Sequence, residues 1–228
     1  MAPFFLGKGS LKMQQKIWAE FIGTAMLLIS VVGSGIMAEA LSGGNTGVAL
    51  LANAIATGCM LYVLITTLGP VSGAHFNPAV TLAFTLRGEC KPQQAVLFVC
   101  AQVAGGILGV WAAHGMFDLP ILQLSTTERS GSAQWFAEVL ATLGLLFAIF
   151  GGIAKAPGQV AALVAIYITG AYWFTASTSF ANPAVTIARS LTDTFAGILP
   201  THAPGFIAMQ LIGAVIGAYT LPRLFAND

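Results

Sequence analysis

The sequence predicts an all-α membrane protein with six transmembrane helices and two re-entrant half-helices, arranged as inverted three-helix repeats. Three observations support this prediction: the apolar composition, the lengths of the apolar segments and an internal repeat. Of the 228 residues, 57% are hydrophobic and only 7% are charged, whereas an ordinary soluble domain has roughly 25% charged residues. Because a soluble globule needs many more polar side chains to cover its surface, we expect lipid to surround most of this chain.

The charges and cysteines exclude several other classes of protein. The formal net charge is +1 with no basic cluster, whereas duplex binding needs clustered Lys and Arg, so we expect no nucleic-acid partner. Cys59, Cys90 and Cys100 form no CxxC pair and are odd in number, so we expect packing residues rather than disulfides or a metal site. No cofactor is expected. The N-terminus lacks the apolar core and cleavage site of a removable signal peptide.

Six apolar segments are long enough to cross about 30 Å of hydrocarbon, which takes about 20 helical residues. They are residues 17–40, 47–68, 94–116, 133–153, 159–177 and 205–221. Two further apolar segments, residues 77–86 and 182–191, are too short to cross. Seven Lys and Arg residues lie on one side of the predicted spans and two on the other. This asymmetry predicts a multi-pass protein of the inner (cytoplasmic) membrane with both termini in the cytoplasm.

An internal repeat relates the two halves of the chain. Residues 77–83, Asn-Pro-Ala-Val-Thr-Leu-Ala, recur at 182–188 with six of seven positions identical, and residues 18–24 recur in part at 136–142. Each half contains three spans, an odd number, so the second half must be inverted relative to the first. We therefore expect a cytoplasmic N-terminal segment (1–16), a first repeat (17–116), an outer loop (117–132), a second repeat (133–221) and a cytoplasmic tail (222–228).

The inverted arrangement suggests a role for the two short apolar segments, residues 77–86 and 182–191. Asn followed by Pro is typical of a helix start, with Asn as the cap and Pro at the first helical position. Since each short segment must return to its own side, we expect two helix N-termini to meet near the membrane midplane, each with about half a positive charge. Such a centre repels cations and can hydrogen-bond a neutral solute. The alternative, two surface helices, leaves the matched duplication unexplained.

Two acidic residues lie within the apolar spans at matched positions, Glu20 and Glu138. An intramembrane carboxylate is costly and by default functional. We expect each to anchor a re-entrant loop by accepting hydrogen bonds from its N–H groups. A proton relay is the alternative, but it needs titratable neighbours, and the spans offer only His114 and Glu39.

These motifs resemble the aquaporin and aquaglyceroporin family (major intrinsic proteins). The resemblance rests on Ser-Gly-Ala-His-Phe-Asn-Pro-Ala-Val-Thr at 72–81, the second Asn-Pro-Ala at 182–184 and Ala-Glu-Phe-Ile-Gly-Thr at 19–24, and it covers about residues 16–221. It implies a homotetramer in the lipid bilayer with a pore through each monomer. The implied pore centre consists of Asn77, Pro78, Ala79, Asn182, Pro183 and Ala184.

Two further residues precede the Asn-Pro-Ala motifs at equivalent positions. His75 is expected to line the cytoplasmic half of the pore, and Phe180 is its counterpart in the second half. For both residues the alternative is a role in packing.

In this family, four positions form a constriction outside the pore centre. Counting from the two motifs places Thr57, Gly170, Ser179 and Val185 at these positions. Water-selective members have aromatic or His side chains and an Arg there, and glycerol-conducting members usually keep the Arg. The resemblance therefore implies a wider, uncharged ring that passes solutes bulkier than water. Arg189, four residues after Val185, could lean toward the pore mouth or extend to the outer membrane interface.

The expected function is a passive channel for small neutral solutes, including glycerol, arsenous acid and related metalloid hydroxides and urea, and for water, with ions and protons excluded. With valine directly after the second Asn-Pro-Ala, the sequence resembles a bacterial branch of aquaglyceroporins associated with arsenic handling. The alternatives are a water-selective aquaporin and a secondary transporter, which shares inverted repeats. An enzyme is not expected, because the spans offer no credible set of catalytic residues.

Overall fold

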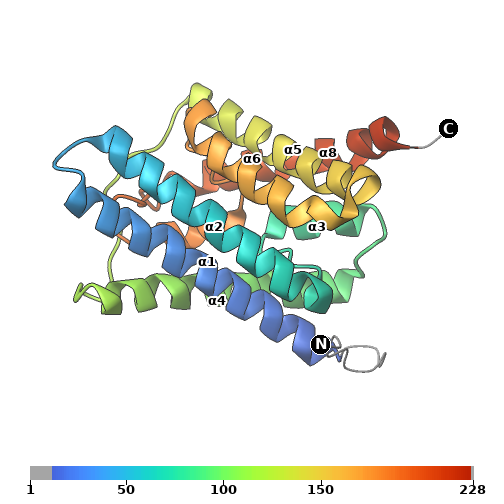
Figure 1. The fold of residues 1–228 in the computed structure, drawn as a ribbon, viewed down its shortest axis with the longest axis horizontal. Coiled ribbons are helices and arrows are strands. Elements are labelled where there is room, and N and C mark those ends of the chain that lie inside the picture. The colour runs from blue at the N-terminus through green and yellow to red at the C-terminus, as the bar shows by residue number, and fades with distance from the viewer. Residues whose placement is uncertain (1–11, 227–228) are drawn as a thin grey trace, which may run out of the picture.

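The computed structural model describes residues 12–226, and this part of the chain folds as a bundle of helices without strands. The predicted terminal segments therefore lie partly outside the described residues. The long helices run side by side, and α1 begins at the same end of the bundle at which α8 ends (Figure 1). In chain order the elements are α1 (Met13–Leu41), α2 (Thr46–Ser72), α3 (Pro78–Leu86), α4 (Pro92–Met116), α5 (Ser132–Lys155), the 3-10 turn η1 (Pro157–Gln159), α6 (Val160–Phe174), α7 (Pro183–Arg189) and α8 (Ala203–Phe225).

Five of the six predicted spans form helices that are long and apolar enough to cross a membrane: α1, α2, α4, α5 and α8. The sixth, predicted over residues 159–177, is shorter. Its helix, α6, has 15 residues and is about 22 Å long at 1.5 Å per residue. A 3-10 turn begins this segment at Pro157, and extended backbone at Thr175 ends it. The remaining predicted residues join the loop that leads into α7.

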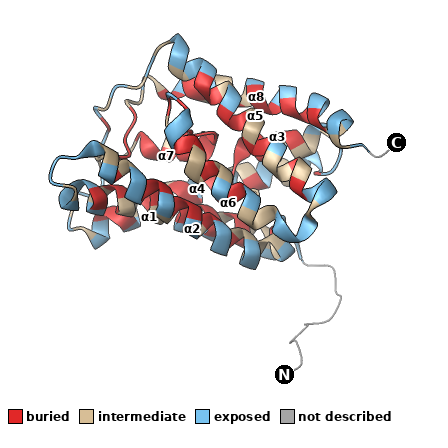
Figure 2. Cartoon of the chain, turned by 45° about the horizontal axis from the view of Figure 1, so that its top comes forward, coloured by how far each residue is buried: buried red, intermediate tan, exposed pale blue. Residues whose placement is uncertain are grey.

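The inverted repeat is visible in how the helices pack. α1 packs against α4 and α2 in the first half, and α5 packs against α8 and α6 in the second. Each half-helix reaches into the opposite half, because α3 packs against α8 and α7 packs against α4. Buried residues follow the inward sides of the helices, while exposed residues cover the outside (Figure 2). Many of the exposed side chains are large and apolar, for example Trp18, Ile166 and Phe174, as expected where a protein faces lipid.

Glycine allows the paired helices to approach closely. Gly105 and Gly109 of α4 lie against backbone carbonyls of α1, and Gly213 of α8 lies against the Val139 carbonyl of α5. A Cβ at Gly213 would lie 2.7 Å from that carbonyl oxygen. Small residues at such contacts are how helices pack in lipid without a hydrophobic force between them. The equivalent contacts in the two halves hold α4 and α8 at the depth from which their side chains support the re-entrant loops.

Candidate functional site

Both Asn-Pro motifs start helices, as predicted. Asn77 and Asn182 are the N-caps of α3 and α7, with extended backbones at φ −156° and −157°. The Asn77 Oδ1 accepts a hydrogen bond from the Ala79 N–H at 2.8 Å, and the Asn182 Oδ1 accepts one from the Ala184 N–H at 3.0 Å. The cap therefore fixes each side-chain oxygen toward its own helix and turns the amide nitrogen toward the opposite loop.

The two asparagines bind the two loops to each other. The Asn77 Nδ2 donates to the Ala181 carbonyl at 2.7 Å, and the Asn182 Nδ2 donates to the Phe76 carbonyl at 2.8 Å. A side-chain amide carries two hydrogens, and each of these bonds uses one of them. One N–H on each asparagine is therefore left for another acceptor.

The backbone of the two loops repeats as closely as their sequence does. Ala74 and Phe76 have φ values of 49° and 48°, and Ser179 and Ala181, each 105 positions later, have values of 51° and 48°. This left-handed conformation costs a non-glycine residue about 1–2 kcal/mol. Four such residues persist only where surrounding contacts determine the loop conformation.

Glu20 supplies these contacts for the first loop. Its carboxylate accepts hydrogen bonds from the backbone N–H groups of His75 at 3.0 Å and Phe76 at 2.7 Å. The Ser72 hydroxyl and the Gln102 amide donate to it at 2.5 and 2.7 Å. Glu20 is fully buried, and every one of these donors belongs to the loop or to the helices around it.

Glu138 makes the equivalent contacts in the second half. It accepts from the N–H groups of Phe180 at 3.0 Å and Ala181 at 2.9 Å and from the Gln210 amide at 2.6 Å. Sequence reasoning missed both glutamines, although Gln-x-x-Gly recurs at 102–105 and 210–213 and could have indicated them. The relay partners considered above lie elsewhere: His114 contacts Thr192 and the Ile121 carbonyl in the loops, and Glu39 is exposed.

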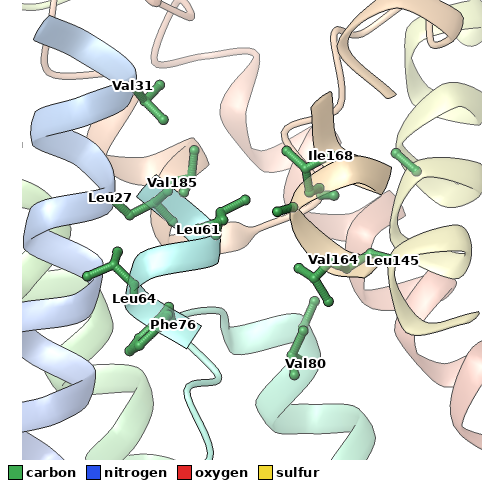
Figure 3. Close-up of a cluster of buried hydrophobic side chains, with 14 of the residues drawn as sticks. Leu27, Val31, Leu61, Leu64, Phe76, Val80, Leu145, Val164, Ile168 and Val185 are labelled. Atoms are coloured by element: carbon green, nitrogen blue, oxygen red, sulfur yellow. The ribbon is translucent and has the colours of Figure 1, made fainter. Parts of the chain in front are cut away.

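A cavity of about 120 Å³ runs past both asparagines. Its walls come from α1, α2, α5, α6 and the two half-helices, and they are mainly apolar, as Figure 3 shows for side chains such as Leu27, Val80, Val164 and Val185. Polar groups lie along this apolar surface. They are contributed by Thr57, His75, Asn77, Tyr172, Ser179, Asn182 and Arg189.

His75 and Phe180 both line the cavity, and both also pack against neighbours. The His75 Nδ1 lies 3.1 Å from the Thr81 hydroxyl, and its ring stacks on Phe84 with centroids 4.8 Å apart. Phe180 packs edge-on against Phe206 at 5.1 Å. Lining and packing are therefore not alternatives for these two residues.

Comparison with known proteins identifies the family. A model of the family described as "Major intrinsic protein" matches residues 8–172, more than half of the chain. The chain belongs to the major intrinsic protein family.

Individual relatives agree with this assignment. Aquaglyceroporin AqpS of Rhizobium meliloti (strain 1021) is 55% identical over 197 residues, covering 86% of this chain and 84% of that protein. Aquaporin Z of Brucella melitensis biotype 1 is 28% identical over 235 residues, covering 95% of this chain and 100% of that protein. The X-ray structure of the aquaglyceroporin from Plasmodium falciparum matches with a TM-score of 0.71 at 17% identity, over 94% of this chain and 99% of that one, and supports the fold alone.

As a major intrinsic protein, the chain is a multi-pass membrane channel for water and small solutes, and it is a passive channel rather than an enzyme. Of the four constriction positions implied by the resemblance, three line the cavity: Thr57, Ser179 and Val185. The Ser179 hydroxyl is buried and has no hydrogen-bond partner among the described residues. Ser179 borders the cavity, but its hydroxyl oxygen itself exposes almost no surface there.

The fourth position, Gly170, is not among the residues that line the cavity. The α6 residues that line the cavity, Val160, Val164, Ile168 and Tyr172, are spaced by four, and Gly170 lies about 200° around the helix from Ile168. A Cβ on Gly170 would instead meet the Phe174 ring at 3.7 Å. Tyr172 of the same helix lines the cavity, with its hydroxyl 3.2 Å from the Thr57 Oγ1. A count along the chain from Asn182 cannot predict this, because it does not determine the rotation of a helix.

Arg189 is buried in this major intrinsic protein, with 3% of its surface exposed, and it lines the cavity. Its side chain therefore does not extend to the membrane interface. The position follows from the helix period, since Arg189 lies four residues after Val185 on the same face of α7.

Proposed function

We propose that this channel conducts neutral solutes of polyol size, including glycerol, arsenous acid and related metalloid hydroxides and urea, together with water, and that it excludes ions and protons. The observation that carries the proposal is the composition of the cavity beside the second half-helix. Val185 takes the place of the arginine that the family usually has there, and Thr57 and Ser179 add small hydroxyl side chains. A valine at position 185 leaves more room and fewer fixed charges than an arginine there would.

The cavity suits a solute with one apolar and one hydroxyl-bearing side. Leu27, Val80 and Val164 supply apolar wall, against which the carbon skeleton of a polyol can lie without losing hydrogen bonds. Asn77 and Asn182, which line the cavity, supply the remaining amide donors. Water satisfies the same groups, so water flux is expected together with solute flux.

Cation exclusion is supported by the two helix starts. Donors of both asparagines and the N-terminal ends of α3 and α7 lie beside the same cavity. Aligned peptide dipoles make these ends positive, which repels cations and protons. Glu20 and Glu138 do not line the cavity, and the backbone and glutamine N–H groups that donate to their carboxylates offset part of their negative charge.

Orientation and assembly extend the proposal. We place both termini in the cytoplasm of a cell whose inner membrane holds the channel, because α1 begins and α8 ends at one end of the bundle (Figure 1) and the Lys and Arg asymmetry favours that end inside. The cavity lies within one chain, so each monomer of the proposed homotetramer has its own pore. The name of the 55%-identical relative, an aquaglyceroporin, supports the solute class.

Osmotic swelling of proteoliposomes tests the proposal with a panel of glycerol, urea and arsenous acid beside water. We expect flux of all of them, without saturation or dependence on a counter-ion. Val185→Trp should block every flux because it fills the cavity. The matched control is Val63→Trp, since Val63 is 53% exposed on the outside of α2, and it should leave flux unchanged.

Two alternatives predict different results. Tyr172 and Arg189 are bulky cavity residues and favour a water-selective channel, which would show water flux with no measurable flux of larger solutes. Saturable uptake that requires a counter-ion would indicate a secondary transporter. Either result would overturn the proposed solute class or mechanism.

A further inference from the structure

The two half-helices present equivalent residues to the same cavity. Val80 and Phe84 of α3 line it, and so do Val185 and Arg189 of α7, each 105 positions later. In the first half the ring of Phe84 stacks on His75. In the second half the Arg189 guanidinium lies 3.4 Å from the Phe180 ring centroid. The aromatic and basic partners are exchanged between the halves, and the second half directs a guanidinium where the first has an aromatic ring.

Arg189 is held firmly but has donors to spare. Its Nε donates to the Ala196 carbonyl, and its planar group covers the face of Phe180. Among the described residues, no carboxylate lies within ion-pair distance of Arg189. The two Nη nitrogens of Arg189 form no hydrogen bond with any of these residues. A guanidinium has five N–H donors, so four remain for acceptors in the cavity. A buried cation with no anionic partner is costly, and a polar pathway beside it is the arrangement that lowers that cost.

A second guanidinium lies nearby. Arg129, in the segment between α4 and α5, lies 5.3 Å from the same Phe180 ring centroid, and its Nε donates to the Gly197 carbonyl at 2.8 Å. Burial lowers the pKa of Arg129, which lies outside the membrane-spanning segments. Arg129 and Arg189 together line a second pocket, the vestibule, whose other lining residues are Thr46, Gly47, Leu50, Asn53, Thr178 and Phe195.

The vestibule lies at the end of the bundle opposite the chain termini, where the α1–α2 turn lies (Figure 1). Arg189 lines both the vestibule and the cavity, so it lies at the junction between them. Four acidic residues lie at this end of the bundle: Glu39, Asp118, Glu128 and Asp193. Glu39 and Asp193 line a separate pocket that shares Phe195 with the vestibule, and Asp193 accepts hydrogen bonds from the backbone and side chain of Thr126. Among the described residues, none of the four forms an ion pair with Arg129 or Arg189.

We propose that Arg189, supported by Arg129, is the selectivity arginine of this channel, and that it binds solute oxygens and excludes cations at the junction of vestibule and cavity. Four residues along a helix correspond to about 6 Å. The backbone of residue 189 therefore lies about 6 Å further along α7 from the asparagine pair than that of residue 185. Because the guanidinium belongs to residue 189, the constriction around Val185 can stay wide. The fixed N–H donors and the positive charge are then supplied at the entrance to the cavity. This inference rests on the proposed channel function and assigns its charge selectivity to a residue outside the four family positions.

The role of Arg189 can be tested by measuring potassium leak and the glycerol-to-water flux ratio in proteoliposomes. Arg189→Gln removes the charge but retains a polar side chain, and Arg189→Lys keeps the charge but loses the planar fork of donors. We expect Arg189→Gln to raise potassium leak into proteoliposomes about tenfold and to change the glycerol-to-water flux ratio. Arg189→Lys should keep leak within about twofold of the parent while the ratio still changes. Arg87→Gln is the matched control, because Arg87 pairs with Glu89 at 2.5 Å in a different pocket.

A rescue separates a filtering role from a structural one. Adding Val185→Arg to the Arg189→Gln protein returns a guanidinium one turn further in, so leak should fall back to the parent level while glycerol flux drops. If Arg189→Gln is not recovered from membranes, Arg129→Gln takes its place, because Arg129 is in a loop and only half-buried. Its leak should then rise at least threefold.

Two results would overturn the inference. One is a leak and a flux ratio for Arg189→Gln, or for Arg129→Gln in its place, equal to those of Arg87→Gln. The other is a double variant that remains as leaky as Arg189→Gln. A parent protein that conducts no glycerol would instead contradict the proposed solute class. The potassium-leak measurement would still test whether Arg189 excludes cations.

Discussion

Glu138→Leu removes the carboxylate that holds the second re-entrant loop, and the structure allows its effect to be estimated. The Phe180 and Ala181 N–H groups donate to Glu138 at 3.0 and 2.9 Å, and both residues are buried. Leucine accepts no hydrogen bond, so both donors lose their partner. Each buried unsatisfied donor costs about 1–3 kcal/mol. The loss of both hydrogen bonds should therefore lower the free energy of unfolding by about 2–6 kcal/mol.

Glu138→Gln should be milder. Its remaining carbonyl oxygen can accept from one of the two N–H groups, while the new NH₂ group faces the other donor. One lost bond corresponds to a decrease of about 1–3 kcal/mol in the free energy of unfolding. The expected order of stability is therefore parent, then Glu138→Gln, then Glu138→Leu. Solute flux should fall in the same order, because the Ala181 carbonyl that accepts from Asn77 lies in the released loop.

Reversible unfolding in mixed micelles, followed by helical circular dichroism, measures these differences. Hydrogen exchange at the Phe180 and Ala181 amides reports the loop directly and should accelerate in both variants. The control is Glu39→Leu, since Glu39 is exposed in α1, and a surface change of this kind stays within about 0.5 kcal/mol. If Glu138→Leu also stays within about 0.5 kcal/mol with unchanged amide exchange, the carboxylate does not anchor the loop.

Two further predictions concern the cavity. Asn77→Asp and Asn182→Asp replace an amide donor with a carboxylate 2.7–2.8 Å from a carbonyl oxygen, so membrane yield or glycerol flux should fall at least tenfold. The control Asn45→Asp caps α2 at an exposed site, where Asp caps as well as Asn, and normal yield and flux in all three variants would remove the asparagines from the pathway. Val185→Arg adds a guanidinium to the cavity wall, so at matched membrane yield glycerol flux should fall several-fold more than water flux; an equal decrease in both would show that position 185 does not form the constriction.

Local physical rules explain what could be predicted from the sequence. Apolar segments of about 20 residues predict spans because the hydrocarbon thickness and the helical rise are fixed. Asn77-Pro78 and Asn182-Pro183 predict helix starts because capping depends on neighbouring backbone groups alone. The inverted repeat follows from the sequence match and an odd number of spans. Each of these inferences needs only residues near each other in the chain.

The length of α6 depends on a more distant contact. The predicted span ran to residue 177, but the helix ends at Phe174. The following residues enter the loop whose N–H groups donate to Glu138 of α5. Hydropathy cannot report this ending, because the residues remain apolar while their backbone is recruited by a carboxylate from another helix.

The rotation of α6 and the partners of the glutamates were likewise decided by tertiary packing. Tyr172 rather than Gly170 lines the cavity, since the face that a helix presents depends on how it packs against α2 and α5. Gln102 and Gln210 contact the carboxylates only because glycine contacts bring α4 against α1 and α8 against α5.

Arg189 shows most clearly what the sequence predicts and what only the tertiary structure determines. The helix period places it on the face of Val185 from the sequence alone. Whether that face meets lipid, protein or the cavity depends on which helices enclose α7, and a long flexible side chain can reach either an interface or a pore. The structure brings Phe180 and the Ala196 carbonyl to the guanidinium. These residues belong to the loops on either side of α7, and the folded conformation of those loops turns the side chain toward the cavity.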